Sequence, residues 1–561
     1  MSMNTIDRRR FLAAAAAFAA WSACGSLRTR GIARGERIDV LLRRGSILDG
    51  NGGAAFTADI AIQGDRIVGI GDYDAADAAR VIDIDGLSIA PGFVDIHTHS
   101  DASILRFPGA ESRVRQGVTT EITGNCGGSA APKKPGDDDD AADAGDSAKQ
   151  RWTGVRSYSD AWRAAKPALN HAMLIGHGTL RRAVLGNVDR EATSSELAEM
   201  ARMLDEALAE GAIGMSTGLE YVPGIYAPAA EIEHLARVVA ARGGLYASHM
   251  RSEEDKLLEA IDEILALGRN TGVRVQVSHL KACGRSNWQL LDEAIARIER
   301  ARQAGVDVMA DAYPYTAYST TLTILLEPWS REGGAEAITS RLRDPALRQR
   351  MLAELPPHVA RDPGGFELVV IASVKDKSHE VCVGKSLVEI AAAWKCEPAD
   401  ACLRLLEASN GEVSFIGHGI QDVGVDRVLA HPLVMVGSDG RSMAPFGRQL
   451  ERPHPRSYGT FPRALGVYCR ERGLFDLPTA IRKMTSMPAD RAGIRDRGRI
   501  EVGAFADLVV FDAKLVRDEA SWQEPQRYPT GIRHVAVNGE FVVWDGEGTG
   551  ARPGRWLEAA R

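Results

Sequence analysis

Hydrophobic and polar positions follow two different periods through the middle of the chain. Residues 193–210 begin with a capping box at Thr193 and Glu196, a start signal for a helix. Apolar residues then recur on one helical face: Leu197, Met200, Leu204 and Leu208. The run "AIGMSTG" that follows predicts a buried strand, and "VRVQVSHLK" alternates as a strand that ends on His279. Repeated strand–helix units of this spacing predict an α/β fold with a parallel sheet, closed into a barrel.

The two ends of the chain have a different pattern. Short apolar runs separated by turn residues appear near the N-terminus in "IDVLLRRGSILDG" and "ADIAIQGDRIVGIG". Similar runs return near the C-terminus in "ADLVVFD" and "IRHVAVNGEFVVWDG". Such runs are typical of antiparallel strands. We therefore expect one small β-domain assembled from both ends, over residues 37–90 and 495–550.

Two segments interrupt the strand–helix pattern of the middle region. Residues 133–150 are charged and low in complexity, which predicts a solvated loop without a catalytic role. Residues 331–430 have the pattern of a separate small α/β insertion. The strand "PLVMVGSDG" then resumes the main pattern and ends on Asp439. The barrel is accordingly expected over residues 91–330 and 431–494.

Composition narrows the class of protein without identifying it. The chain has 561 residues, a formal net charge of −7, 45% hydrophobic residues and 25% charged residues, which is the balance of an ordinary globular protein. Nucleic acid is not expected as a partner, because phosphate binding favours a basic surface. Seven cysteines in a chain of this length do not form a disulfide framework.

The first 30 residues have the layout of a signal peptide. An arginine run precedes a short apolar stretch in "NTIDRRRFLAAAAAFAAWSACG", and Arg8, Arg9, Phe11 and Leu12 resemble the twin-arginine type. The alternatives are a basic, Ala-rich helix of the folded domain and a lipid anchor at Cys24, whose preceding Trp21 fits a lipobox poorly. We expect export to the periplasm in the folded state, with no membrane-spanning segment in the mature chain.

A first candidate for chemistry is the pair His97 and His99 in "PGFVDIHTHSD". Alternate residues of a strand point to the same side, so both imidazoles can reach one metal ion. Two buried histidines that simply make hydrogen bonds in the core are the alternative. The Pro-Gly lead-in and the trailing Asp101 favour the metal site.

Four further ligand-type residues fall where predicted strands give way to loops: Cys126, His249, His279 and Asp439. Active sites of α/β barrels gather at the carboxyl ends of the strands, so these side chains are expected to meet. Thiolate and imidazole donors favour Zn²⁺. Asp439 would then serve as the general base that takes a proton from water and delivers it to a leaving nitrogen. A simple strand-end cap is the other interpretation of Asp439.

Cys126, in "TEITGNCGGSAAP", admits three interpretations: metal ligand, covalent nucleophile and inert buried thiol. A cysteine nucleophile needs one neighbouring histidine and an oxyanion hole, and four histidines at one mouth are not that arrangement. Coordination also explains how a thiol would survive export. We therefore favour the ligand, and we expect Cys283 to serve packing.

The order of motifs resembles the N-acyl-D-amino-acid deacylases, or D-aminoacylases, of the amidohydrolase superfamily. The resemblance covers about residues 37–550 and rests on these motifs: HTH, GNCG, GHGTLR, STGLEYVPG, SHMRSE, SHLK, DAYPY, GSDG and HPRSYGTFPR. It implies a (β/α)8 TIM-like barrel, a small β-barrel or sandwich built from both termini, and a small insertion after the DAYPY strand.

The resemblance also implies roles for single residues. Cys126, His249 and His279 correspond to a tight zinc site, and His97 and His99, sharing Cys126, to a second and weaker site. Asp439 corresponds to the catalytic acid/base. Positions that hold the substrate correspond to Lys281, Tyr313, Ser319 and Arg456. Arg456 suits an α-carboxylate, because a guanidinium offers a planar, bidentate partner.

The function that follows is zinc-dependent hydrolysis of N-acyl-D-amino acids to a carboxylate and a free D-amino acid. An amidohydrolase of cyclic amides (hydantoinase- or dihydroorotase-like) or of dipeptides is the alternative, and an exported metal- or ligand-binding protein without activity is a third. Tyr318 and the long loop after Asp439 depart from the family pattern. Both lie near the expected acyl or side-chain pocket, which leaves substrate preference open.

Overall fold

The computed structural model describes residues 37–133, 152–445 and 451–558. The predicted signal peptide and Cys24 lie outside these ranges, as does nearly all of the predicted loop 133–150. Among the described residues, no helix is both long enough and apolar enough to cross a membrane.

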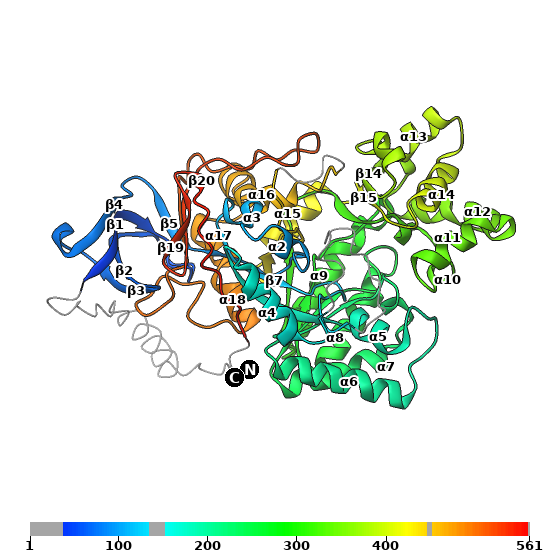
Figure 1. Cartoon of the computed structure of the whole chain (residues 1–561), viewed down its shortest axis with the longest axis horizontal. Helices are drawn as coiled ribbons and strands as arrows, with labels where there is room; N and C mark the ends of the chain where they lie inside the picture. The colour runs from blue at the N-terminus through cyan, green and yellow to red at the C-terminus, as the bar shows by residue number, and fades with distance from the viewer. Residues whose placement is uncertain (1–36, 134–151, 446–450, 559–561) are drawn as a thin grey trace, which may run out of the picture.

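An eight-stranded parallel sheet forms the centre of the molecule (Figure 1). Its strands lie in chain order, with β16 next to β12: β6 (Phe93–Asp95), β7 (Val118–Thr123), β8 (Asn170–Gly176), β9 (Gly214–Gly218), β10 (Leu245–His249), β11 (Arg274–Val277), β12 (Val308–Ala312) and β16 (Val434–Val436). A parallel bridge between Thr98 and Gly440 joins the segments that follow the first and last strands. The predicted α/β barrel is therefore confirmed.

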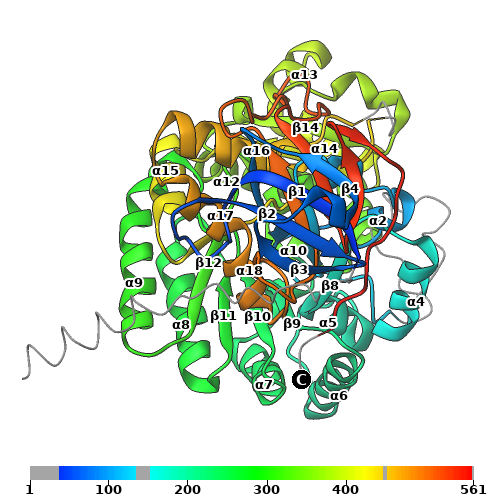
Figure 2. The same ribbon diagram turned by 90° about the vertical axis from the view of Figure 1, so that its left-hand side faces the viewer.

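Helices cover the outside of this barrel (Figure 2). Those that follow the strands are α4 (Val155–Ala165), α5 (His177–Leu185), α6 (Ser194–Ala209), α7 (Ala229–Ala241), α8 (Leu257–Thr271), α9 (Leu291–Gln303) and α15 (Asp422–Ala430), with α17 (Leu477–Met484) and α18 (Ser486–Ala492) after β16. Helix α6 begins with the predicted capping box of Thr193 and Glu196 and buries Met200, Leu204 and Leu208. Three short helices, α2 (Ser103–Arg106), α3 (Glu111–Val114) and α16 (Arg456–Arg463), lie in the connections.

A nine-stranded sheet joins the two ends of the chain, drawn in blue and red in Figure 1. It contains β1 (Ile38–Ile47), β2 (Phe56–Gln63), β3 (Arg66–Gly71), β4 (Ala78–Asp83), β5 (Ser88–Pro91), β17 (Leu508–Phe511), β18 (Ile532–Val537), β19 (Glu540–Trp544) and β20 (Glu547–Gly548). The N-terminal strand β5 pairs with the C-terminal strand β17. Most neighbouring strands pair antiparallel, as the sequence predicted. Strand β1 is the exception, because it pairs in parallel with β4 and β5 after the β2–β3 hairpin reverses the chain.

A third, three-stranded sheet with its own helices stands beside the barrel (Figure 1). Its elements are β13 (Tyr318–Thr321), α10 (Pro328–Arg331), α11 (Ala335–Arg343), α12 (Pro345–Arg361), β14 (Val369–Val374), α13 (Leu387–Trp394), α14 (Pro398–Ala408) and β15 (Val413–Gly417). Strand β13 starts before the predicted boundary at residue 331, because Tyr318 pairs with Gly417 of β15. Helix α15 contacts the barrel strands β16 and β12.

Candidate metal centre

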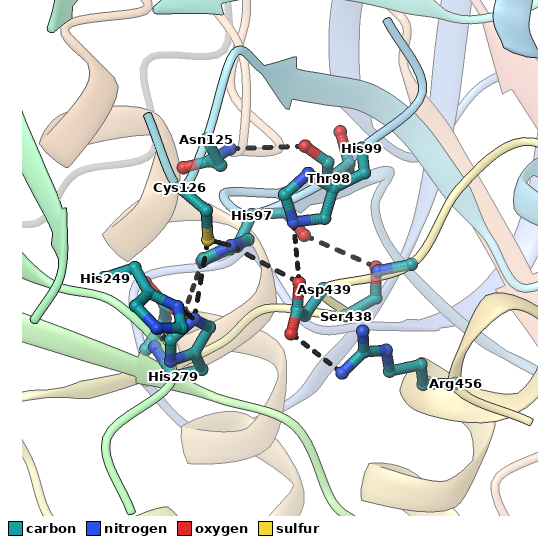
Figure 3. A network of polar contacts seen from close by, with 12 residues as sticks. His97, Thr98, His99, Asn125, Cys126, His249, His279, Ser438, Asp439 and Arg456 are labelled. Atoms are coloured by element: carbon teal, nitrogen blue, oxygen red, sulfur yellow. Dashed lines mark hydrogen bonds and ion pairs between the residues drawn. The ribbon is translucent and has the colours of Figure 1, made fainter. Parts of the chain in front are cut away.

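Six side chains of ligand type converge at the carboxyl ends of the barrel strands (Figure 3). They come from four connections and one strand: His97 and His99 after β6, Cys126 after β7, His249 at the end of β10, His279 after β11 and Asp439 after β16. They include all the residues that the sequence predicted as metal ligands. Barrel closure is what brings residues more than 300 positions apart in the chain into one site.

Cys126, His249 and His279 form a compact donor set. The Cys126 Sγ atom lies 3.5 Å from His279 Nε2, and His249 Nδ1 lies 2.9 Å from the same Nε2. Ligand atoms that share a tetrahedral zinc ion lie about 3.5 Å apart. One sulfur and two imidazole nitrogens at this spacing fit a zinc ion.

A second donor set shares the same sulfur. His97, His99, Cys126 and Asp439 each offer a ligand atom, and these atoms all lie within 4.8 Å of one another. The Cys126 Sγ atom lies 3.3 Å from His97 Nε2, and His99 Nε2 lies 2.8 Å from Asp439 Oδ1. The geometry therefore has room for two neighbouring ions that share Cys126.

Three carboxylates behind the histidines hold the rings in place. Asp311 lies 3.1 Å from His97 Nδ1, and Glu220 lies 2.9 Å from His249 Nε2. Glu253 lies 2.8 Å from His279 Nδ1. Such carboxylate–histidine pairs orient metal ligands and raise their basicity. None of the three carboxylates was predicted from the sequence, although they occur in the motifs DAYPY, STGLEYVPG and SHMRSE.

The backbone at the site departs from the extended strand that the sequence predicted. Strand β11 ends at Val277 and β16 at Val436, so the predictions that these strands end on His279 and Asp439 were wrong. Cys126, His279 and Asp439 instead have φ angles of 51°, 34° and 52°. Residues with a Cβ atom rarely adopt this left-handed region, and such strain is concentrated at functional sites. The turn after each strand directs the side chain into the mouth.

The electrostatics of the mouth favour the charged forms of Cys126 and Asp439. Burial alone would raise the pKa of the Cys126 thiol, but the imidazoles of His97 and His279 lower it well below its usual value. Burial would also raise the pKa of Asp439, and the Arg456 guanidinium together with His97 lowers it well below the ordinary range. A thiolate is the form that binds metal, and a carboxylate is the form that accepts a proton.

The site opens into a cavity of about 270 Å³. All four predicted substrate contacts line it: Lys281, Tyr313, Ser319 and Arg456. Arg456 Nη1 lies 2.7 Å from Asp439 Oδ2, and Arg456 Nη2 donates to the Ser319 carbonyl at 3.2 Å. Lys281 forms an ion pair with Glu253 and lies 3.0 Å from His279 Nδ1. Cys283, expected to serve packing, is buried and also lines the cavity.

Known proteins with similar sequences and structures agree with this geometry. The profile of the amidohydrolase family matches residues 80–367 and 416–543. An N-acyl-D-glutamate deacylase of Alcaligenes xylosoxydans xylosoxydans is 40% identical over 524 residues, which cover 93% of this chain and 97% of that protein. The resemblance to the N-acyl-D-amino-acid deacylases is confirmed.

Solved structures give the same result. The N-acyl-D-glutamate deacylase from Bordetella bronchiseptica, complexed with zinc and a phosphonate inhibitor, has a TM-score of 0.79 at 37% identity and matches 93% of this chain and 100% of its own. A D-aminoacylase described as having a binuclear metal center gives the same TM-score, identity and coverage. The barrel, the donor set and the match to the family profile all point to one family. This chain belongs to the amidohydrolase family.

Proposed function

We propose that this protein hydrolyses the amide bond of N-acyl-D-amino acids and releases a carboxylate and a free D-amino acid. The observation that carries the proposal is the Cys126–His249–His279 donor set beside Asp439 and Arg456 in one cavity. The activity of the relatives, N-acyl-D-glutamate deacylase and D-aminoacylase, supports the substrate class and its configuration.

One zinc ion held by Cys126, His249 and His279 fits the donor set, with a second, weaker position at His97, His99 and Cys126. When bound, zinc polarises a carbonyl and lowers the pKa of water to about 7. The Asp439 carboxylate takes the proton of the water that attacks the acyl carbon. It then donates this proton to the leaving nitrogen as the C–N bond breaks.

The remaining polar groups of the cavity would orient the substrate. The Arg456 guanidinium suits the α-carboxylate, for which it provides a bidentate partner. The Tyr313 hydroxyl has no hydrogen-bond partner among the described residues, and burial raises its pKa, so it stays a donor. Lys281 and Ser319 complete the wall near the proposed reaction centre.

A substrate panel with metal analysis on the same sample tests this function. We expect turnover of N-acetyl-D-amino acids, little turnover of the L-enantiomers, and zinc in the active protein. Turnover confined to hydantoins, dihydroorotate or dipeptides would replace the proposal by the cyclic-amide or peptide alternative. Full activity in protein free of transition metal would overturn it.

We also propose that the protein is exported to the periplasm by the twin-arginine route. The support is the sequence around Arg8 and Arg9, followed by a short apolar stretch. Cell fractionation of the wild-type chain and of the double variant Arg8→Lys, Arg9→Lys tests it. We expect the wild-type enzyme in the periplasm and the variant in the cytoplasm, and equal distribution of the two would contradict the proposal.

A further inference from the structure

Two carboxylates of the cavity take no part in the site described so far. Glu254 lines the cavity from the connection after β10, and Asp362 lines it from the end of α12 in the small α/β unit. Neither is among the groups that surround the donor set. Both side chains therefore border the cavity that would receive the substrate.

The other carboxylates of this cavity have basic partners. Asp439 pairs with Arg456 and Glu253 with Lys281, while Glu220 contacts the imidazole of His249. Within the described part of the chain, Glu254 and Asp362 have no lysine, arginine or histidine at ion-pair distance. The cavity is therefore locally acidic where these two side chains meet it.

Asp362 is the clearer case of a buried carboxyl group that lacks a partner. It is only 8% exposed, and one of its oxygens accepts a hydrogen bond from the Tyr318 hydroxyl. Its Oδ1 atom has no hydrogen-bond partner among the described residues. A buried carboxylate of this kind gains stability from a cation brought to it.

The pKa shifts of Glu254 and Asp362 also indicate that a counter-charge is missing beside them. Burial raises the pKa of Glu254, and the neighbouring Asp362 raises it further. Burial also raises the pKa of Asp362, against the hydrogen bond from Tyr318. Both shifts favour the protonated carboxyls in the absence of a counter-charge, although Arg361 acts against the shift of Glu254 and Lys281 against that of Asp362. A cation bound between the two carboxyls would favour their ionised forms. A substrate carboxylate at this place would add to the repulsion.

We infer that Glu254 and Asp362 form a subsite for an ammonium or guanidinium group of the substrate. The inference rests on the proposed N-acyl-amino-acid hydrolysis and assigns its substrate class. The cation is carried either by the D-amino-acid side chain, as in D-lysine or D-arginine, or by the acyl group. Acidic side chains such as D-glutamate, the substrate in the name of the first relative, are disfavoured here.

Matched pairs of substrates test the subsite and separate its two sources. N-acetyl-D-lysine against N-acetyl-D-norleucine places the charge in the side chain. N-(6-aminohexanoyl)-D-norleucine against N-hexanoyl-D-norleucine places it in the acyl group. We expect kcat/KM to favour the charged member of one pair by about tenfold or more, which corresponds to about 1.4 kcal/mol. No preference in either pair, or a preference for N-acetyl-D-glutamate over both neutral substrates, would overturn the inference.

Variants assign the preference to the two residues. Glu254→Gln and Asp362→Asn should each reduce the preference about tenfold and leave kcat/KM for the neutral substrate nearly unchanged. Asp255→Asn is the matched control, because Asp255 is the exposed next residue and does not line the cavity. A preference that survives in Glu254→Gln overturns the assignment even if Asp362→Asn fails to fold.

Calorimetric measurement of ligand binding to the zinc-loaded protein distinguishes a failure of this inference from a failure of the proposed function. If no N-acyl-D-amino acid is turned over, the proposed function fails. The same charged and neutral compounds still report on the subsite through their dissociation constants. Equal affinity within each pair would overturn the subsite, and tighter binding of a charged member that Glu254→Gln removes would support it.

Discussion

Arg456 Nη1 lies 2.7 Å from Asp439 Oδ2 at the mouth of the barrel, with both side chains almost fully buried. The group proposed to hold the substrate α-carboxylate thus touches the group proposed to move the proton. The ion pair keeps Asp439 deprotonated and ready to accept a proton. In the proposed function, the same contact would bring the substrate α-carboxylate close to the reacting amide.

Replacing Arg456 by lysine tests the carboxylate contact. Lysine keeps the charge but loses the planar, bidentate geometry, so KM for N-acetyl-D-amino acids should rise roughly tenfold with a smaller fall in kcat. Steady-state kinetics with an N-acetyl-D-amino acid and its carboxamide measure the effect. The prediction fails if the variant distinguishes carboxylate from carboxamide as strongly as the wild type does.

Replacing Asp439 by asparagine removes the proton acceptor and keeps the shape of the side chain. We expect kcat to fall by roughly 100- to 10,000-fold. The zinc ion held by Cys126, His249 and His279 should stay bound, because all three of these donors remain. Kinetics and metal analysis on one preparation check both halves, and near-normal turnover would remove Asp439 from the mechanism.

The thiol of Cys126 is shared by both donor sets, so Cys126→Ser should lose zinc and activity together. The hydroxyl of serine is a much poorer zinc ligand than a thiolate. Metal analysis after dialysis measures the loss. Cys396→Ser, at a partly exposed cysteine outside the cavity, is the control and should retain both. Retained zinc in Cys126→Ser would contradict the assignment.

Glu220 contacts His249 Nε2 at 2.9 Å and does not belong to the predicted ligands. Glu220→Gln should weaken zinc affinity by about 10- to 100-fold, because it removes the carboxylate that orients the ring. Competition with a zinc chelator measures the affinity. Glu259→Gln, at an exposed position of α8, serves as the control. Unchanged affinity would make Glu220 a purely structural residue.

His171 gives the fold a pH dependence separate from catalysis. Burial lowers its pKa from 6.5 to about 3, so the folded state keeps this ring neutral while the unfolded chain protonates it. Stability is therefore lost as the pH falls below about 6.5, and the contribution between pH 7 and pH 5 is about 2 kcal/mol. Denaturant unfolding at both pH values should show this difference in wild type and a smaller one in His171→Gln. If the free energy of unfolding changes equally between the two pH values in wild type and in His171→Gln, His171 is excluded as the cause.

The sequence predicted those features that depend on local pattern. The capping box at Thr193 begins α6, the alternating apolar runs form strands, and His249 lies at the end of β10. Ligand-type residues at the ends of several predicted strands were enough to predict a metal site at the barrel mouth. The six ligand-type residues could be assigned to one site because a parallel barrel brings the carboxyl ends of its strands together.

The tertiary structure alone decided how these residues meet. Hydrophobic periodicity carries no information about which loops touch, so the contacts of Asp311, Glu220 and Glu253 with the histidines could not be predicted. Left-handed backbone at Cys126, His279 and Asp439 was equally hidden, because local propensity disfavours it and only the closed barrel holds it. The sequence by itself determined the elements and the candidate donors of this protein. Packing of distant segments decided the pairing of Asp439 with Arg456 and left Asp362 Oδ1 without a hydrogen-bond partner among the described residues, since both depend on which groups share a buried space.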